Sequence, residues 1–173
     1  MRGRVALVSA VVLALVLGGL VFVLFTAEPS TNKLADSPLL GKSAPDLAGD
    51  DYDLLDSAGS WVLVNFFATW CTPCVAEHDD LVAFSNTHAV AGDASVVSVV
   101  FSDDDDDVKA FFDERGGDWP VVSDDDGRIA TDWGVTGVPE SYLIAPDGTV
   151  RAKIVGGVDA DKLEPLRVQA KGA

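Results

Sequence analysis

The sequence predicts an α/β fold in which a mixed sheet is flanked by helices. Short, nearly continuous apolar runs at 61–67 and 95–101 are typical of strands that are covered on both faces. Near the C-terminus, residues 141–144 and 149–155 read as strands around an Ala-Pro-Asp-Gly turn, which indicates an antiparallel hairpin. Strands that first alternate with helices and then end in a hairpin form the pattern of a mixed sheet.

Three helices are expected between and after these strands. The segment from Cys71 to about Thr87 directly follows the first strand. Apolar residues spaced i, i+3 and i+4 within 108–112 predict a second helix, which ends at Gly116-Gly117. We expect the first aspartate of the run at 103–107 to cap this helix. An i, i+3 stripe near the C-terminus starts the third helix. The two histidines are expected on helix surfaces, without a role: His78 and His88.

The N-terminal segment is expected to anchor the chain in a membrane. Two arginines within residues 1–4 precede an uncharged run at 5–25, which as a helix would span about 30 Å of hydrocarbon. A cleaved signal peptide has a shorter apolar core and small residues before its cleavage site, whereas the run ends on the bulky Phe25. We therefore favour an uncleaved signal anchor, with cleavage as the alternative. Basic residues before it and acidic residues after it place the rest of the chain outside the cytoplasm.

Composition limits what the exported part can do. The chain has 173 residues, with 12 Lys and Arg against 28 Asp and Glu and a net charge of -16. Such an acidic chain is a poor match for nucleic acid, because phosphates are neutralised by clustered basic residues. Two cysteines are too few for a disulfide-rich scaffold or an all-cysteine zinc site. We divide the chain into a cytoplasmic stub at 1–4, a transmembrane signal anchor at 5–25, a polar linker at 26–37 and one globular domain at 38–173.

The cysteine pair carries the predicted chemistry. Cys71 and Cys74 stand in the string Trp-Cys-Thr-Pro-Cys, directly after a buried strand and at the start of a helix. Free backbone N–H groups and the positive end of the helix dipole stabilise a thiolate there, so Cys71 is the expected nucleophile. A purely structural disulfide would close a small loop and stabilise little. A zinc site lacks a second ligand pair, and a haem-attachment motif lacks a histidine after Cys74. We therefore predict a redox-active Cys71–Cys74 disulfide.

Several segments in the same order resemble one family. The strings at 61–78 (WVLVNFFATWCTPCVAEH) and 137–144 (GVPESYLI) resemble the thioredoxin-like thiol–disulfide oxidoreductases of the bacterial cell envelope. They are most similar to the membrane-anchored group that serves cytochrome c maturation, the CcmG/DsbE and ResA/TlpA type. The resemblance extends from about residue 41 to the C-terminal helix. It implies a thioredoxin-like fold with an added N-terminal hairpin and a central strand–helix insert at about 90–117, and it implies neither a cofactor nor a metal.

The resemblance also implies further site residues. Pro139 matches the cis-proline of the group, which helps to bind the extended backbone of the substrate. Glu77 would be the proton-handling group, because Asn65 stands where ordinary thioredoxins carry a buried acid. A surface charge is the alternative for Glu77 and for Glu140, and a simple core position is the alternative for Trp70. The catalytic set is then Cys71, Cys74 and Glu77, and the substrate-binding set is Trp70, Val138, Pro139 and Glu140.

The predicted function is thiol–disulfide exchange outside the cytoplasm, on a single-pass protein of the bacterial cell membrane. The expected activity is reduction of a disulfide on apocytochrome c or its haem-ligation partner, with a membrane thiol transporter as the electron donor. Carboxylates near Cys71 disfavour its thiolate and hence the reduced protein, whereas the helix start has the opposite effect. The alternatives are an oxidase that forms disulfides in exported proteins, a peroxidase, and a chaperone for haem or apocytochrome without redox chemistry.

Overall fold

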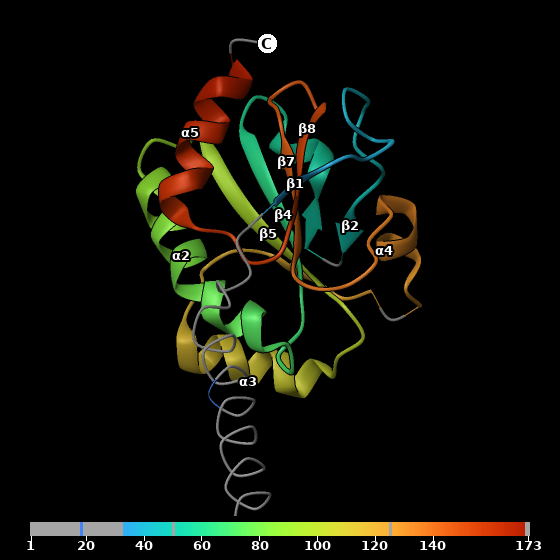
Figure 1. The fold of residues 1–173 in the computed structure, drawn as a ribbon, viewed down its shortest axis with the longest axis vertical. Helices are drawn as coiled ribbons and strands as arrows, with labels where there is room; N and C mark the ends of the chain where they lie inside the picture. Colours follow the sequence, from blue (N-terminus) through green and yellow to red (C-terminus); the bar gives the residue numbers. More distant parts are fainter. Residues whose placement is uncertain (1–17, 19–32, 50, 125, 172–173) are drawn as a thin grey trace, which may run out of the picture.

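The computed structural model describes residues 33–49, 51–124 and 126–171, and Gly18 besides. Its main feature is a six-stranded sheet with the strand order β1-β8-β7-β4-β5-β6 (Figure 1). β4 is parallel to β5 and antiparallel to β7, so the predicted mixed sheet is confirmed. The strands of this sheet are β1 (Lys33–Ala35), β4 (Trp61–Phe67), β5 (Ala94–Val100), β6 (Val121–Val122), β7 (Glu140–Ile144) and β8 (Val150–Val155).

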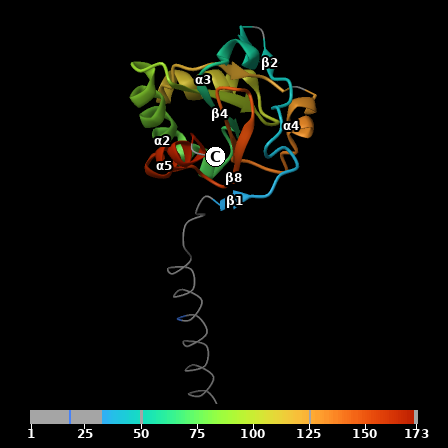
Figure 2. The same ribbon diagram turned by 90° about the horizontal axis from the view of Figure 1, so that it is seen from above.

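Helices cover both faces of the sheet. α2 and α5 lie side by side on one face, and α4 lies on the other (Figure 2). α3 lies at the end of the sheet where α2 begins. The three helices expected from the sequence are therefore present, and α4 adds a fourth. Their bounds are α2 (Thr72–Ala89), α3 (Asp105–Arg115), α4 (Arg128–Trp133) and α5 (Ala160–Lys171).

The central strand β4 is buried along its whole length because its side chains alternate between two cores. Leu63 packs with apolar residues of α2 and α5 on one face. Val64 and Phe66 pack with Trp133 of α4 on the other. Asn65 therefore points to the face of α2, which places a buried polar side chain next to the helix that starts with the cysteines.

The elements that the sequence did not reveal are short. They include β1, β6, α4 and the 3-10 helix η1 (Leu54–Ser57). β2 (Ala48–Gly49) and β3 (Tyr52–Asp53) form a separate hairpin. This hairpin fits the N-terminal hairpin implied by the resemblance. The polar linker expected at 26–37 needs a correction, because its residues 33–35 form β1 and pair with β8. The insert expected at 90–117 contains β5, which pairs with both β4 and β6 and is an inner strand of the sheet.

Two local expectations have different outcomes. The Ala-Pro-Asp-Gly hairpin is confirmed: Gly148 has a φ of 79° and donates its N–H to Ala145 O at 2.8 Å. The cap of α3 is one residue later than expected. Asp104 accepts a hydrogen bond from Asp106 N at 2.9 Å, so the second aspartate of the run caps the helix.

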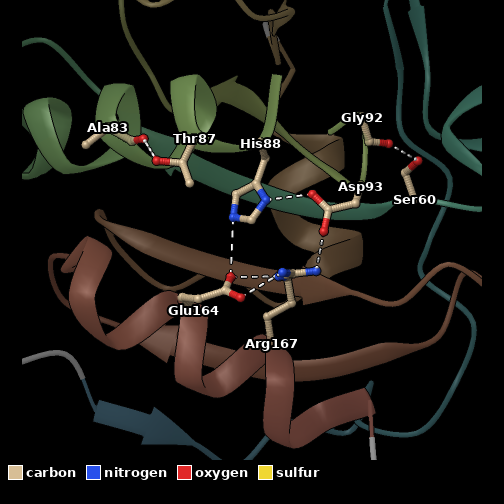
Figure 3. Close-up of polar contacts among 8 residues, drawn as sticks. All are labelled: Ser60, Ala83, Thr87, His88, Gly92, Asp93, Glu164 and Arg167. Carbon is tan, nitrogen blue, oxygen red and sulfur yellow. Dashed lines mark hydrogen bonds and ion pairs between the residues drawn. The ribbon is translucent and has the colours of Figure 1, made fainter. Parts of the chain in front are cut away.

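Both histidines were expected on the surface and are in fact buried. His78 packs against Phe111 and Phe112, and its Nε2 lies 2.9 Å from Gly116 O. His88 lies between two acids, with Nδ1 2.7 Å from Asp93 and Nε2 3.3 Å from Glu164 (Figure 3). Single-sequence spacing could not show this, because the partners come from other elements.

The expected membrane segment at 5–25 lies outside the described residues, apart from Gly18. Among the residues that the structure does describe, no helix is both long enough and apolar enough to cross a bilayer.

Candidate redox site

The two cysteines lie where β4 gives way to α2. After β4 ends, Cys71 N donates to Ala68 O at 3.2 Å and closes a turn. Cys71 then serves as the N-terminal cap of α2, with its Sγ 3.2 Å from Cys74 N. Pro73 occupies the first turn of the helix, where a missing N–H costs little. The sequence thus folds into a turn that presents Cys71 at the positive end of a helix dipole.

The cysteines form a disulfide, as predicted, with their Cα atoms 5.2 Å apart. Both are nearly buried, with exposed fractions of 5% and 3%. They belong to an apolar cluster with Phe67 of β4 and Phe111 of α3, and Val138 packs against this cluster. The sulfurs therefore sit in an apolar setting at the end of the sheet.

Glu77 lies on the same helix, three residues after Cys74, and is only 3% exposed. Its Oε1 accepts a hydrogen bond from Asn65 Nδ2 at 2.9 Å, and its Oε2 accepts one from Val158 N at 2.6 Å. Burial raises the pKa of Glu77 to about 7, although both hydrogen bonds act in the opposite direction. A carboxyl group with this pKa can accept and return a proton at neutral pH.

Pro139 follows a cis peptide bond from Val138 at the entrance to β7. Pro139 is buried, and its carbonyl accepts a hydrogen bond from Gly156 N at 3.0 Å. Within the described part of the chain, no hydrogen bond occupies the backbone N–H and C=O of Val138. The structure thus brings Val138 to the cysteine cluster, and the described residues do not hydrogen-bond its backbone groups.

Trp70 and Glu140 lie in contrasting surroundings. Trp70 is 60% exposed, and its Nε1 donates to Ser102 O at 3.1 Å. Glu140 is only 2% exposed and forms an ion pair with Lys153 Nζ at 2.8 Å. Its Oε1 also accepts a hydrogen bond from Thr136 Oγ1 at 2.8 Å. The substrate contact predicted for Glu140 therefore needs a correction, because its carboxylate is engaged inside the domain.

Sequence reasoning missed the residues that support the site from distant elements. Val158 holds Glu77 across 81 positions of the chain, and Ser141 Oγ accepts from Asn65 Nδ2 at 3.0 Å. Asp103 accepts hydrogen bonds from Thr69, just before the cysteine motif. The sequence offers one signal for such supporting residues, which is a polar residue at an inward-facing strand position. Of the three residues named here, only Ser141 has it.

Solved structures of similar proteins have the same fold. A crystal structure of a thiol:disulfide interchange protein DsbE from Chlorobium tepidum has a TM-score of 0.68 and 31% identity, and the match covers 76% of this chain and 96% of that one. A secreted thiol-disulfide isomerase from Corynebacterium glutamicum has a TM-score of 0.70 at 20% identity, over 86% of this chain and 96% of that one, which is a likeness in fold. The fold and the cysteine pair define a thioredoxin-like thiol–disulfide oxidoreductase.

A family model described as the AhpC/TSA family matches residues 37–153, and the chain belongs to this family. The thiol:disulfide interchange protein CycY of Rhizobium leguminosarum bv. viciae is 35% identical over 131 residues, which are 75% of this chain and 62% of that protein. The corresponding DsbE of Allochromatium vinosum is 32% identical over 80% of this chain and 78% of its own length. The thiol-disulfide oxidoreductase ResA of Bacillus cereus is 31% identical over 91% of this chain and 92% of its own length.

Proposed function

We propose that this chain is a reductant in cytochrome c maturation, which reduces a disulfide on apocytochrome c or its haem-ligation partner. The class of reaction follows from the family and the cysteine pair. The substrate is supported by the resemblance of the segments at 61–78 and 137–144 to the membrane-anchored maturation group. Relatives named DsbE and ResA, which this chain matches over most of their length, agree with that group.

The proposed reaction passes two electrons from the cysteine pair to the partner. The Cys71 thiolate attacks one sulfur of the partner's disulfide, and the other partner sulfur leaves as a thiolate. A mixed disulfide now joins Cys71 to the partner. The Cys74 thiolate then attacks Cys71 Sγ, and the second partner sulfur leaves. The partner ends as a dithiol, and this chain ends with the Cys71–Cys74 disulfide.

The observation that carries the proposed exchange reaction is the buried carboxyl group of Glu77. In the second step Cys74 must lose a proton before it can attack, and a nearby base must take that proton. Glu77 lies on the same helix, three residues after Cys74, and its pKa is raised to about 7 by burial. The protonated carboxyl group can later return the proton to a leaving thiolate. Both tasks suit a group that changes its charge near neutral pH.

The proposed substrate-binding set is Trp70, Val138 and Pro139, without Glu140. Val138 offers free backbone groups for an extended peptide, as in strand addition. Trp70 is the exposed aromatic side chain directly before Cys71. We further propose a single-pass location in a bacterial cell membrane, with the domain outside the cytoplasm and a membrane thiol transporter as electron donor. The basis for this location is the arginine-flanked apolar run at 5–25.

The alternative is an oxidase that introduces disulfides into exported proteins. The helix start at Cys71 favours it, because a stabilised thiolate makes the reduced form the stable one. The reduction potential distinguishes the two directions. We expect equilibration with glutathione or thioredoxin to give a potential more negative than about -200 mV. A potential near that of the strong oxidant DsbA, about -120 mV, would support the oxidase instead.

Trapping identifies the partners and tests the roles of the two cysteines. In Cys74→Ser the resolving thiol is missing, so mixed disulfides through Cys71 should accumulate and can be named by mass spectrometry. Cys71→Ser is the matched control and should trap few partners. If Cys71→Ser trapped the partners and Cys74→Ser did not, the assignment of the nucleophile would be wrong. If the trapped proteins included no cytochrome or cytochrome-assembly protein, the proposed substrate would fail while the exchange chemistry stood.

A further inference from the structure

The loop between β5 and α3 contacts the turn that carries the reactive cysteine. β4 and β5 are neighbouring parallel strands, so the loops at their carboxyl ends lie side by side. Phe101 N donates to Phe67 O at 2.8 Å and extends this pairing beyond the end of β5. From there the loop at 101–104 runs along the turn at 68–71. Neither loop belongs to a regular element, so direct contacts between them decide how the turn is held.

Asp103 provides the main contact. Its Oδ2 accepts a hydrogen bond from Thr69 N at 2.5 Å and another from Thr69 Oγ1 at 2.8 Å. Its Oδ1 accepts one from Asp104 N at 2.9 Å. Among the described residues no backbone carbonyl accepts from the N–H of Thr69, so this N–H needs a side-chain acceptor. Hydrogen bonds to a charged acceptor are stronger than those between neutral groups.

Ser102 makes a second contact with the same turn through its carbonyl, which accepts from Trp70 Nε1 at 3.1 Å. Ser102 has a φ of 52°, and among the described residues it is the one non-glycine residue with a positive φ. Side chains disfavour this conformation, and it is concentrated at functional sites. Adjacent residues of one loop therefore hold Thr69 and Trp70, the two residues before Cys71.

Asp103 is not needed to start α3. Asp104 is the N-terminal cap of that helix, and the aspartates that follow fill its first turn. The Oδ2 of Asp103 is instead turned toward Thr69, while its Oδ1 accepts a hydrogen bond from Asp104 N. The first residue of the aspartate run thus has a different task from its neighbours.

We propose that Asp103 is a positioning residue for thiol–disulfide exchange, because it fixes the turn from which Cys71 attacks. Without Asp103, the backbone N–H and the hydroxyl group of Thr69 lose their shared acceptor. The turn then no longer fixes Cys71 at the start of α2. Its negative charge, close to the cysteine motif, also opposes formation of the Cys71 thiolate. This inference rests on the exchange reaction of the proposed function and is independent of the partner protein.

The test uses the reduced chain and the small disulfide 5,5′-dithiobis(2-nitrobenzoic acid), whose two thionitrobenzoate products are followed by absorbance. Asp103→Ala removes both bonds to Thr69, and we expect the rate constant per Cys71 thiolate to fall about 10-fold. Asp103→Asn keeps an oxygen acceptor without the charge, so it should keep the rate within about 3-fold. Removing the charge should also move the pH profile of Cys71 alkylation by iodoacetamide to lower pH.

Asp104→Ala is the matched control, because it removes the cap of α3 and leaves the Thr69 contact in place. It should lower the unfolding temperature while the rate stays within about 2-fold of wild type. An unchanged rate in Asp103→Ala, or equal losses in both alanine variants, would overturn the inference. If Asp103→Ala does not fold, Thr69→Val removes only the hydroxyl bond and should slow exchange about 2- to 3-fold; no change there would also overturn it. A wild-type chain that does not react would instead refute the exchange activity itself.

Discussion

Glu77 is nearly excluded from water, and each oxygen of its carboxyl group accepts a hydrogen bond. The two effects act on its pKa in opposite directions, and burial is the larger. A carboxyl group held in this way costs stability when it is charged, which natural sequences tolerate mainly where the group has a function. The raised pKa of Glu77 can therefore be tested through protein stability, without any substrate.

Stability should depend on pH through Glu77. Its pKa rises from the ordinary glutamate value of 4.5 to about 7 in the folded chain, so the folded state binds the proton more tightly than the unfolded state. The stabilising contribution is complete below about pH 4.5 and is lost as the pH rises through about 7. We expect the free energy of unfolding of the oxidised wild type to fall by roughly 3 kcal/mol across this window relative to Glu77→Gln, measured by urea denaturation. Parallel pH profiles for the two proteins would contradict the raised pKa.

Residues could be predicted from the sequence where the motif itself carries the information. The cysteine pair, the helix that follows it and the place of Glu77 one turn below all follow from spacing within a single string. The hydrogen bond from Val158 to Glu77 could not be predicted, since its partners are 81 positions apart. The surroundings of Glu140 were equally hidden, because Lys153 reaches it from the neighbouring strand β8.

At the scale of elements, α5 is held on α2 by a clasp of charged groups (Figure 3). Arg167 is 5% exposed; its Nη1 lies 2.9 Å from Asp93, and its Nη2 lies 2.7 Å from Glu164. His88 of α2 contacts the same two acids. At the other end of the helix pair, Asp80 accepts a hydrogen bond from Ala160 N at 3.2 Å. The clasp matters for the site because Val158, which holds Glu77, directly precedes α5.

Removing the arginine of the clasp should loosen α5. In Arg167→Met the acids Asp93 and Glu164 lose a shared buried partner, and we expect a loss of about 1 to 2 kcal/mol in the free energy of unfolding. Backbone amides of α5 should then exchange hydrogen faster, while those of β4 stay protected. Lys162→Met is the matched control on the same helix, because its ion pair with Asp159 is exposed and should contribute less than about 0.5 kcal/mol. Equal effects of the two substitutions would show that the clasp does not hold the helix.

Long elements were predictable and short ones were not, for a physical reason. β4 and β5 are seven-residue runs that are apolar at most positions, so burial on both faces is visible in the string. β1 has three residues and β6 has two, and each exists because a neighbouring strand supplies hydrogen-bond partners. α4 is six residues long and is held by Asp124, whose carboxylate accepts from Ile129 N and Ala130 N. Such elements depend on contacts between distant residues rather than on a local pattern.

At the scale of the whole molecule, the chain enters the domain at the same end of the sheet as the redox site. Lys33 begins β1 and pairs with Val155 of β8. Val155 pairs with Glu140 of β7, and Glu140 pairs with Phe66 of β4, just before the cysteine turn. The opposite end of the sheet carries the turn at 145–148 and the segment around Ala58. The proposed membrane anchor would therefore join the domain on its redox side.

The proposed anchor makes this arrangement a prediction about orientation. The stretch at 26–32 spans at most about 25 Å when fully extended, so the redox end should on average face the bilayer.

The full chain, with both cysteines changed to serine, is placed in liposomes and labelled with a fluorophore at Thr72→Cys or, as the matched control, at Ala58→Cys. Both positions are exposed and lie at opposite ends of β4. Lipids with a nitroxide headgroup should quench the label at 72 more than the label at 58. Equal quenching would refute the orientation alone, whereas a chain that does not float with the liposomes would refute the anchor. A redox end that faces the bilayer would bring Cys71 close to a donor embedded in the membrane, and it would favour substrates that are themselves held at the membrane surface.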